Sequence, residues 1–140
     1  MTALEAAGAG VWLYRLVAVL LLLGTGVALL LPGDALLAIA RWAAAFWPFS
    51  GSGIVANTGW LDKIVHVGLF AACGFAVVRA WSGGASRLVM FYFLLFAYGV
   101  VTEVGQLFVP GRSASGTDLV ADAIGAACGV GFGWYWNSRG

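Results

Sequence analysis

The chain has 140 residues, of which 62% are hydrophobic and only 9% are charged, and its mean hydropathy is +0.97. A soluble domain is about half apolar and about a quarter charged, so this composition excludes a water-soluble globule. The many aromatic residues exclude a disordered chain, and a net charge of +1 offers no basic patch for a nucleic acid. The composition is that of an integral membrane protein with a single domain, residues 1–140.

Four stretches are long and apolar enough to cross a bilayer as helices, which takes about 20 residues. They cover residues 11–31, 61–81, 88–109 and 117–136, and runs that contain Gly or Pro follow the first three. No alternation of apolar and polar residues supports a β-barrel. We therefore predict an all-α fold, a membrane bundle of four transmembrane helices.

The first of these stretches also shares a feature with cleaved signal peptides, because residues 38–40, Ala-Ile-Ala, resemble a cleavage site. Its apolar run is longer than the roughly 7–15 residues typical of a signal peptide. We interpret residues 11–31 as an uncleaved helix.

The segment between the first two predicted helices has a different character. Residues 34–48 begin with Asp34, a suitable N-cap, and contain Trp42, Trp47 and one further charged residue, Arg41. The segment is too short to span the membrane alone, and Trp favours the headgroup region. We predict a short interfacial or re-entrant helix here.

The basic residues predict the orientation of the bundle. Arg79 and Arg87 flank the short connection between the second and third helices, and positive charge accumulates in cytoplasmic loops. This orientation also places Arg15 and Arg139 on the inside. We expect a multi-pass protein of the cell membrane with both termini in the cytoplasm.

In this topology the polar residues collect at the opposite, outer side of the membrane. They come from the ends of three predicted helices and from the connection between the third and fourth. We name nine of them the polar cluster and expect them to bind a ligand: Asp62, Lys63, His66, Glu103, Gln106, Arg112, Ser115, Asp118 and Asp122.

The spacing within the fourth helix predicts how these residues approach one another. Asp118 and Asp122 share a stripe with Gly125 and Gly129, because residues four apart lie on one helix face. Small residues let the backbones of two membrane helices come close. We therefore expect this face to pack into the bundle and to bring the aspartates against the second and third helices.

Several of these residues form a pattern that resembles the VanZ-like family of membrane proteins. The pattern has Asp62-Lys63-x-x-His66 at the start of one helix and Glu103-x-x-Gln106 near the end of the next. It continues through Pro110-Gly111-Arg112, Ser115, Asp118 and Gly125. One departure is Asp122, which stands where the family usually has Asn. The resemblance implies a link to lowered sensitivity to glycopeptide antibiotics such as teicoplanin.

The same residues allow more than one kind of chemistry. A carboxylate such as Asp62 beside His66 would orient the imidazole as a general base. His66, Glu103 and Asp118 are therefore candidate catalytic residues. A single histidine with several carboxylates is a poor match to zinc. Cys73 and Cys128 lie in the middle of helices and are interpreted as packing residues. We expect no metal and no cofactor, and the sequence does not decide whether the protein is an enzyme.

Two functions remain open. The first is binding or modification of a lipid-linked envelope component by the polar cluster, with membrane lipids as further partners. The second is an accessory subunit of a larger membrane complex, in which the polar cluster only locks the bundle together. Either function requires paired charges. We expect Glu103 within reach of Lys63 or Arg112, and Asp118 close to His66 or Arg112.

Overall fold

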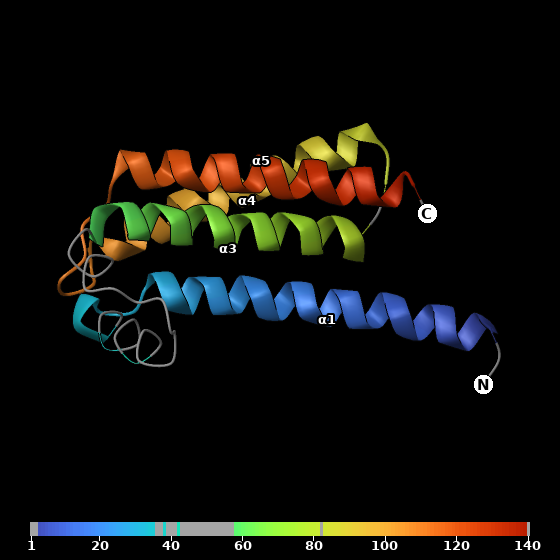
Figure 1. Ribbon diagram of the computed structural model, residues 1–140, viewed down its shortest axis with the longest axis horizontal. Helices are drawn as coiled ribbons and strands as arrows, with labels where there is room; N and C mark the ends of the chain where they lie inside the picture. The colour runs from blue at the N-terminus through green and yellow to red at the C-terminus, as the bar shows by residue number, and fades with distance from the viewer. Residues whose placement is uncertain (1–2, 36–37, 39–41, 43–57, 82, 140) are drawn as a thin grey trace.

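The computed structural model describes residues 3–35, 38, 42, 58–81 and 83–139 (Figure 1). Four long helices dominate it: α1 (Ala3–Leu29), α3 (Thr58–Ala80), α4 (Ala85–Gln106) and α5 (Gly116–Asn137). No strand occurs in these ranges, so the all-α prediction is confirmed. Residues 33–35, 38 and 42 are also helical, and most of the predicted interfacial segment 34–48 lies outside the described residues.

Three of the helices are long and apolar enough to cross a membrane: Gly10–Leu29, Trp60–Ala80 and Ala85–Gln106. The fourth predicted span is not confirmed. Helix α5 is as long as α4, with 22 residues, but it is not among the helices that are apolar enough to count as a span, and Asp118 and Asp122 lie in its first two turns.

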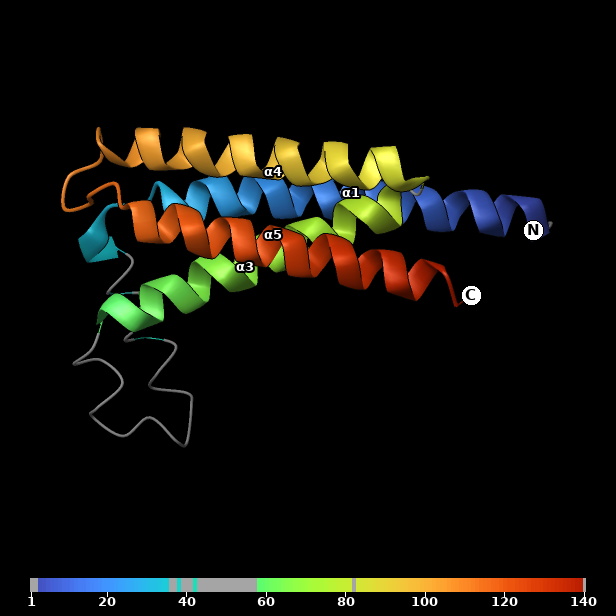
Figure 2. The ribbon, with the colours of Figure 1, turned by 90° about the horizontal axis from the view of Figure 1, so that it is seen from above.

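Successive helices run in opposite directions, so both termini lie at the same end of the bundle (Figure 1). Helices α3, α4 and α5 contact one another (Figure 2), and α1 packs mainly against α3 (Figure 1). Antiparallel neighbours joined by short connections are the usual arrangement of a helix bundle. As a result, the start of α3, the end of α4 and the start of α5 meet at the end opposite the termini.

The contact between α3 and α5 is the most extensive in the bundle, and glycines make it possible. A Cβ atom on Gly125 would overlap the carbonyl oxygen of Val67, and one on Gly129 would overlap that of Ala71. The backbones of the two helices therefore touch over two turns, as small residues permit in membranes. The predicted packing face of the fourth helix is confirmed.

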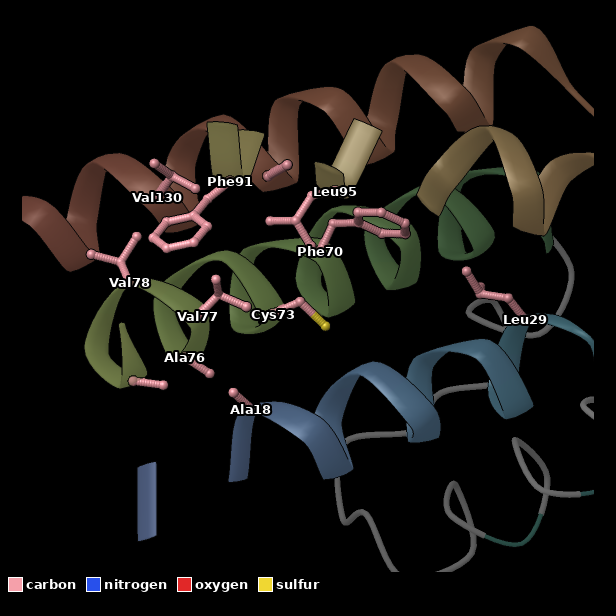
Figure 3. Close-up of a cluster of buried hydrophobic side chains, with 12 residues drawn as sticks. Ala18, Leu29, Phe70, Cys73, Ala76, Val77, Val78, Phe91, Leu95 and Val130 are labelled. Carbon is pink, nitrogen blue, oxygen red and sulfur yellow. The ribbon is translucent and has the colours of Figure 1, made fainter. Parts of the chain in front are cut away.

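A hydrophobic core fills the middle of the bundle (Figure 3). Phe70 and Cys73 of α3 are fully buried in it, together with Phe91 and Leu95 of α4. The packing role expected for Cys73 is confirmed, whereas Cys128 is exposed on α5, so its predicted packing role is wrong. Helix position decides this difference, because Cys128 lies beside the glycine face and not on it.

Polar contacts fasten α1 to this core. Thr25 Oγ1 lies 3.3 Å from Cys73 Sγ on α3. The Tyr98 hydroxyl of α4 donates a 2.6 Å hydrogen bond to the carbonyl oxygen of Leu22. It lies over Gly26, where a Cβ atom would approach it to 2.6 Å. These contacts fix the position of α1 next to α3 and α4.

Candidate functional site

The polar cluster lies at the end of the bundle opposite the two termini (Figure 1). Helices α3 and α5 each contribute residues from their first turns, α4 contributes its last turn, and the connection 107–115 adds Arg112 and Ser115. On both α3 and α5 one charged residue lies near the helix end and a second lies one turn deeper. This spacing arranges the polar cluster in two layers.

The outer layer consists of two ion pairs between different elements. Lys63 Nζ of α3 lies 2.9 Å from Asp118 Oδ1 of α5, and Arg112 Nη1 lies 3.4 Å from Asp62 Oδ1. The Lys63 side chain is 37% exposed and the Asp62 side chain 29% exposed, so the pairs face the surface. We call these the outer ion pairs.

The inner layer is buried. His66 Nδ1 lies 2.7 Å from Asp122 Oδ1, and neither side chain is exposed. Glu103, which is 6% exposed, accepts a 2.7 Å hydrogen bond at Oε2 from the backbone N–H of Ser115. We call His66, Glu103 and Asp122 the inner triad.

The end of α1 also belongs to the polar cluster. The carbonyl oxygen of Leu29 accepts hydrogen bonds from Arg112 Nη2 at 3.1 Å and from Gln106 Nε2 at 3.2 Å. The last carbonyls of a helix have no partner within the helix, and a cation near them is favourable. Arg112 therefore connects three elements: α1, α3 and the connection before α5.

The observed partners correct two predictions. Among the described residues Glu103 pairs with neither Lys63 nor Arg112, because Asp118 and Asp62 near the starts of α5 and α3 hold both cations. Asp122 contacts His66 in place of Asp62, since the close seam of α3 and α5 places Asp122 directly opposite the imidazole. The expected closeness of Asp118 to His66 is confirmed, because they offer atoms within 4.8 Å of each other.

The structure also adds features that the sequence did not indicate. Gly99 leaves room for Asp122, because a Cβ there would lie 3.0 Å from Asp122 Oδ2. Gly111 adopts a positive φ of 74° in the turn after α4 and packs against Gly33. Pro110-Gly111 in the sequence marks this turn, but nothing in the sequence indicates that it closes over the end of α1.

Ser115 takes part through its backbone. Its hydroxyl group lies 2.7 Å from Thr117 Oγ1 at the exposed start of α5. Ser113 is exposed. An imidazole held by a carboxylate is an arrangement found in general bases. The catalytic roles of His66, Glu103 and Asp118 stay predictions.

Two sets of three side chains lie close enough to share a metal ion. The inner triad is one, and Asp62, His66 and Asp118 form the other; in each set the ligand atoms lie within 4.8 Å of one another. The inner triad also has one buried atom without a hydrogen-bond partner on each residue: His66 Nε2, Glu103 Oε1 and Asp122 Oδ2. A single histidine made a metal site unfavourable from the sequence, because the sequence does not show how closely the carboxylates approach that histidine.

With the geometry established, comparison with known proteins is informative. A family model described as VanZ/LLP1 matches residues 17–137, most of the chain and all of the polar cluster. The chain belongs to the VanZ/LLP1 family. The predicted resemblance is thus confirmed, and the apolar helices make the chain a membrane protein of that family. Searches of the curated proteins and of the solved structures found no match.

The structure shows what the departure at Asp122 changes. It stands where the resemblance led us to expect Asn, and it is the residue that contacts His66. An amide at this position would offer a similar hydrogen bond without a charge. In this chain the substitution adds a carboxylate to the buried layer.

Proposed function

We propose that this protein spans the cell membrane four times and binds the headgroup of a lipid-linked envelope component at the polar cluster. The observation that carries the proposal is the convergence of the nine polar residues from three helices and one connection. They meet at one end of a bundle whose core is apolar. Charged groups within membrane helices are expensive and commonly mark functional sites.

The chemistry of the outer ion pairs supports a headgroup as ligand. Lys63 uses one of its donors on Asp118, and Arg112 has a buried Nε without a partner. Lysine and arginine donors suit phosphate or pyrophosphate oxygens. The paired carboxylates suit hydroxyl or amino groups, so a sugar-bearing or zwitterionic headgroup fits the charges better than free phosphate.

The opposite end of the bundle supports the proposed orientation. It brings together Arg15 and Arg79, which contact aromatic rings at the start of α1 and the end of α3. Arg87 and Arg139 belong to the same end. This accumulation of positive charge is typical of a cytoplasmic side. The 22 residues of α5 reach roughly 33 Å at 1.5 Å per residue, enough to cross the hydrocarbon core.

Cysteine labelling in intact cells tests the orientation. In a Cys128→Ser background, Ser113→Cys places an exposed thiol beside the polar cluster, and Ser86→Cys places one at the opposite end. We expect an impermeant thiol reagent to modify the first and spare the second until the cells are opened. The reverse pattern would overturn the topology and the envelope-side ligand with it.

Binding is tested with the purified protein in lipid nanodiscs and two probes, a polyprenyl pyrophosphate with an attached sugar and the same lipid without it. We expect Arg112→Gln and Lys63→Gln to weaken binding of the sugar-bearing lipid about tenfold each. Arg79→Gln is the matched control, because Arg79 lies at the other end. Equal effects of all three substitutions would count against the site.

The family's link to glycopeptide sensitivity extends this proposal to cells. We expect a susceptible bacterial host that expresses the chain to tolerate more teicoplanin than a host that expresses the Arg112→Gln variant. Membrane levels of the two proteins are compared by immunoblot. Equal teicoplanin tolerance at equal protein levels would show that headgroup binding at Arg112 does not cause resistance.

The second candidate function is an accessory subunit of a membrane complex, and the exposure of α1 favours it. Only 11% of the span Gly10–Leu29 is buried, against 39% for Trp60–Ala80. Trp12, Leu16 and Leu23 are among its exposed large side chains. Purification in a mild detergent discriminates the two candidates, because a stoichiometric partner lost on Leu16→Ser and Leu23→Ser substitution would support the accessory role.

A further inference from the structure

The polar cluster contains more negative than positive charge. It has four carboxylates and two permanent cations, and the cations are taken up in the outer ion pairs. Glu103 and Asp122 are the two carboxylates left without a lysine or arginine among the described residues. Their partners are neutral or weakly basic: Glu103 accepts from the backbone N–H of Ser115, and Asp122 contacts the imidazole of His66.

Both of these carboxylates are buried. Glu103 is 6% exposed and Asp122 is fully buried. A buried carboxylate is strongly unfavourable unless a counter-charge or several hydrogen bonds compensate for the lost water. The inner triad contains two such carboxylates, and their partners are one backbone N–H and one imidazole. These partners do not compensate two negative charges.

The unpartnered atoms give independent evidence that something belongs between these side chains. Buried polar atoms in folded proteins nearly always have a partner. Here each residue of the inner triad retains one without a partner: His66 Nε2, Glu103 Oε1 and Asp122 Oδ2. These are three of the five such side-chain atoms among the described residues, and the three residues that carry them are one of the two sets close enough to share a metal ion.

We propose that the inner triad binds one divalent cation. Imidazole suits zinc, iron and nickel, carboxylates suit magnesium, calcium and manganese, and a mixture of the two favours a metal such as Mn²⁺. Ligand atoms around a metal at about 2.1 Å lie roughly 3 to 4 Å apart, so atoms within 4.8 Å need only small side-chain rotations. Two positive charges balance the two unpaired carboxylates. The inner triad is the buried part of the polar cluster, and the cation proposal does not depend on a headgroup binding at the outer ion pairs.

The test uses the full chain in detergent, stripped with a chelator and titrated with Mn²⁺ alone. Electron paramagnetic resonance of the free ion measures binding. We expect about one Mn²⁺ per chain, and a loss of affinity of about tenfold or more in Glu103→Gln and in Asp122→Asn. Both substitutions keep a hydrogen-bond acceptor and remove a charge. Asp118→Asn is the matched control on α5, and we expect it to keep the affinity within about threefold.

A measurement on the unsubstituted protein guards against variants that fail to fold. His66 is the only histidine, so its ring nitrogens are assigned without further work in a sample labelled at histidine. Mn²⁺ should broaden both ring signals at one equivalent. Absence of binding at millimolar Mn²⁺ would overturn the proposal, and so would Asp118→Asn abolishing it while Glu103→Gln does not. A Glu103→Gln variant with parental thermal stability, in a protein that ignores Mn²⁺, would indicate a protonated carboxyl group and would overturn the proposal.

Discussion

The two ends of the bundle both carry polar side chains, but they use them differently. At the end with the termini, arginines lie over aromatic rings: Arg79 over Tyr14 at 4.8 Å and Arg139 over Tyr135 at 4.5 Å. These are partly exposed groups. At the other end the polar cluster joins buried residues of different helices, as in the 2.7 Å contact of His66 with Asp122.

This difference separates anchoring from site formation. Arginine and aromatic side chains reach toward the headgroups from the ends of helices, which fixes the depth of a helix at little cost. Charges one turn inside a bundle do not reach water and must find partners on other helices. The end with the termini, which we call the arginine end after Arg15, Arg79, Arg87 and Arg139, therefore positions the protein in the membrane. The polar cluster sets the geometry of a site.

The largest expected effect comes from the seam of α3 and α5, which holds the ends in register. Gly129→Leu places a side chain into the carbonyl oxygen of Ala71 and forces the helices apart. We expect a loss of about 3 kcal/mol or more, seen as a large drop in thermal midpoint or loss of folded protein. Gly131→Leu is the control, because no atom lies within 4 Å of its added Cβ.

Similar melting of the two variants would show that the glycine face does not determine the packing. Spectroscopic signals from each end of the bundle show how far the structural change extends. In a background with Trp42, Trp47 and Trp60 replaced by Phe, tryptophan fluorescence follows the end with the termini, and the histidine ring signals of His66 follow the polar cluster. We expect Gly129→Leu to disturb both, since the seam runs between them.

The next effect is local to the polar cluster. Arg112→Gln removes the partner of Asp62 and one hydrogen bond to the carbonyl of Leu29. Because Arg112 is largely buried while Asp62 is partly exposed, we expect a loss of about 2 kcal/mol. Adding Asp62→Asn should recover part of it, and a double-mutant cycle on thermal unfolding measures the coupling. Additive losses would show that the pair does not hold the connection to α3.

Much of the fold follows from the sequence because its signals are local. Apolar length indicates the membrane helices, and the spacing of Gly125 and Gly129 indicates the packing face. The fourth span is the exception, since Asp118 and Asp122 lower the apolarity of a helix that packs among the others. The first span differs at its start, where the helix extends back to Ala3.

The membership of the polar cluster was predictable, but its pairing was not. Helical spacing shows which residues share a face, and it does not show which residues face one another across a seam. Asp122 meets His66 because Gly125 brings α5 onto α3, and Glu103 finds a backbone N–H because the connection after α4 folds back. Both outcomes depend on the distance between helices and on a turn, which no local pattern encodes.

A smaller effect is expected midway between the ends. Tyr98→Phe removes the hydrogen bond to the Leu22 carbonyl and leaves the ring in place beside Gly26. The expected cost is about 1 kcal/mol in thermal or denaturant unfolding. Tyr92→Phe on the same helix is the control, because it keeps the ring that contacts Phe93. Equal stability of Tyr98→Phe and the parent would mean that α1 is held by apolar packing alone.

The smallest effect is expected at the arginine end. Arg79→Gln removes a contact with the Tyr14 ring and hydrogen bonds to the Tyr14 hydroxyl and to Asn137. Exposed contacts of this kind contribute about 0.5 to 1 kcal/mol, so the thermal midpoint should fall less than in Arg112→Gln. The loss should also shrink at high salt in detergent, because salt screens exposed charges more than buried ones. A loss as large as that of Arg112→Gln, unchanged by salt, would show that both ends organise the tertiary structure and would remove the distinction between anchor and site.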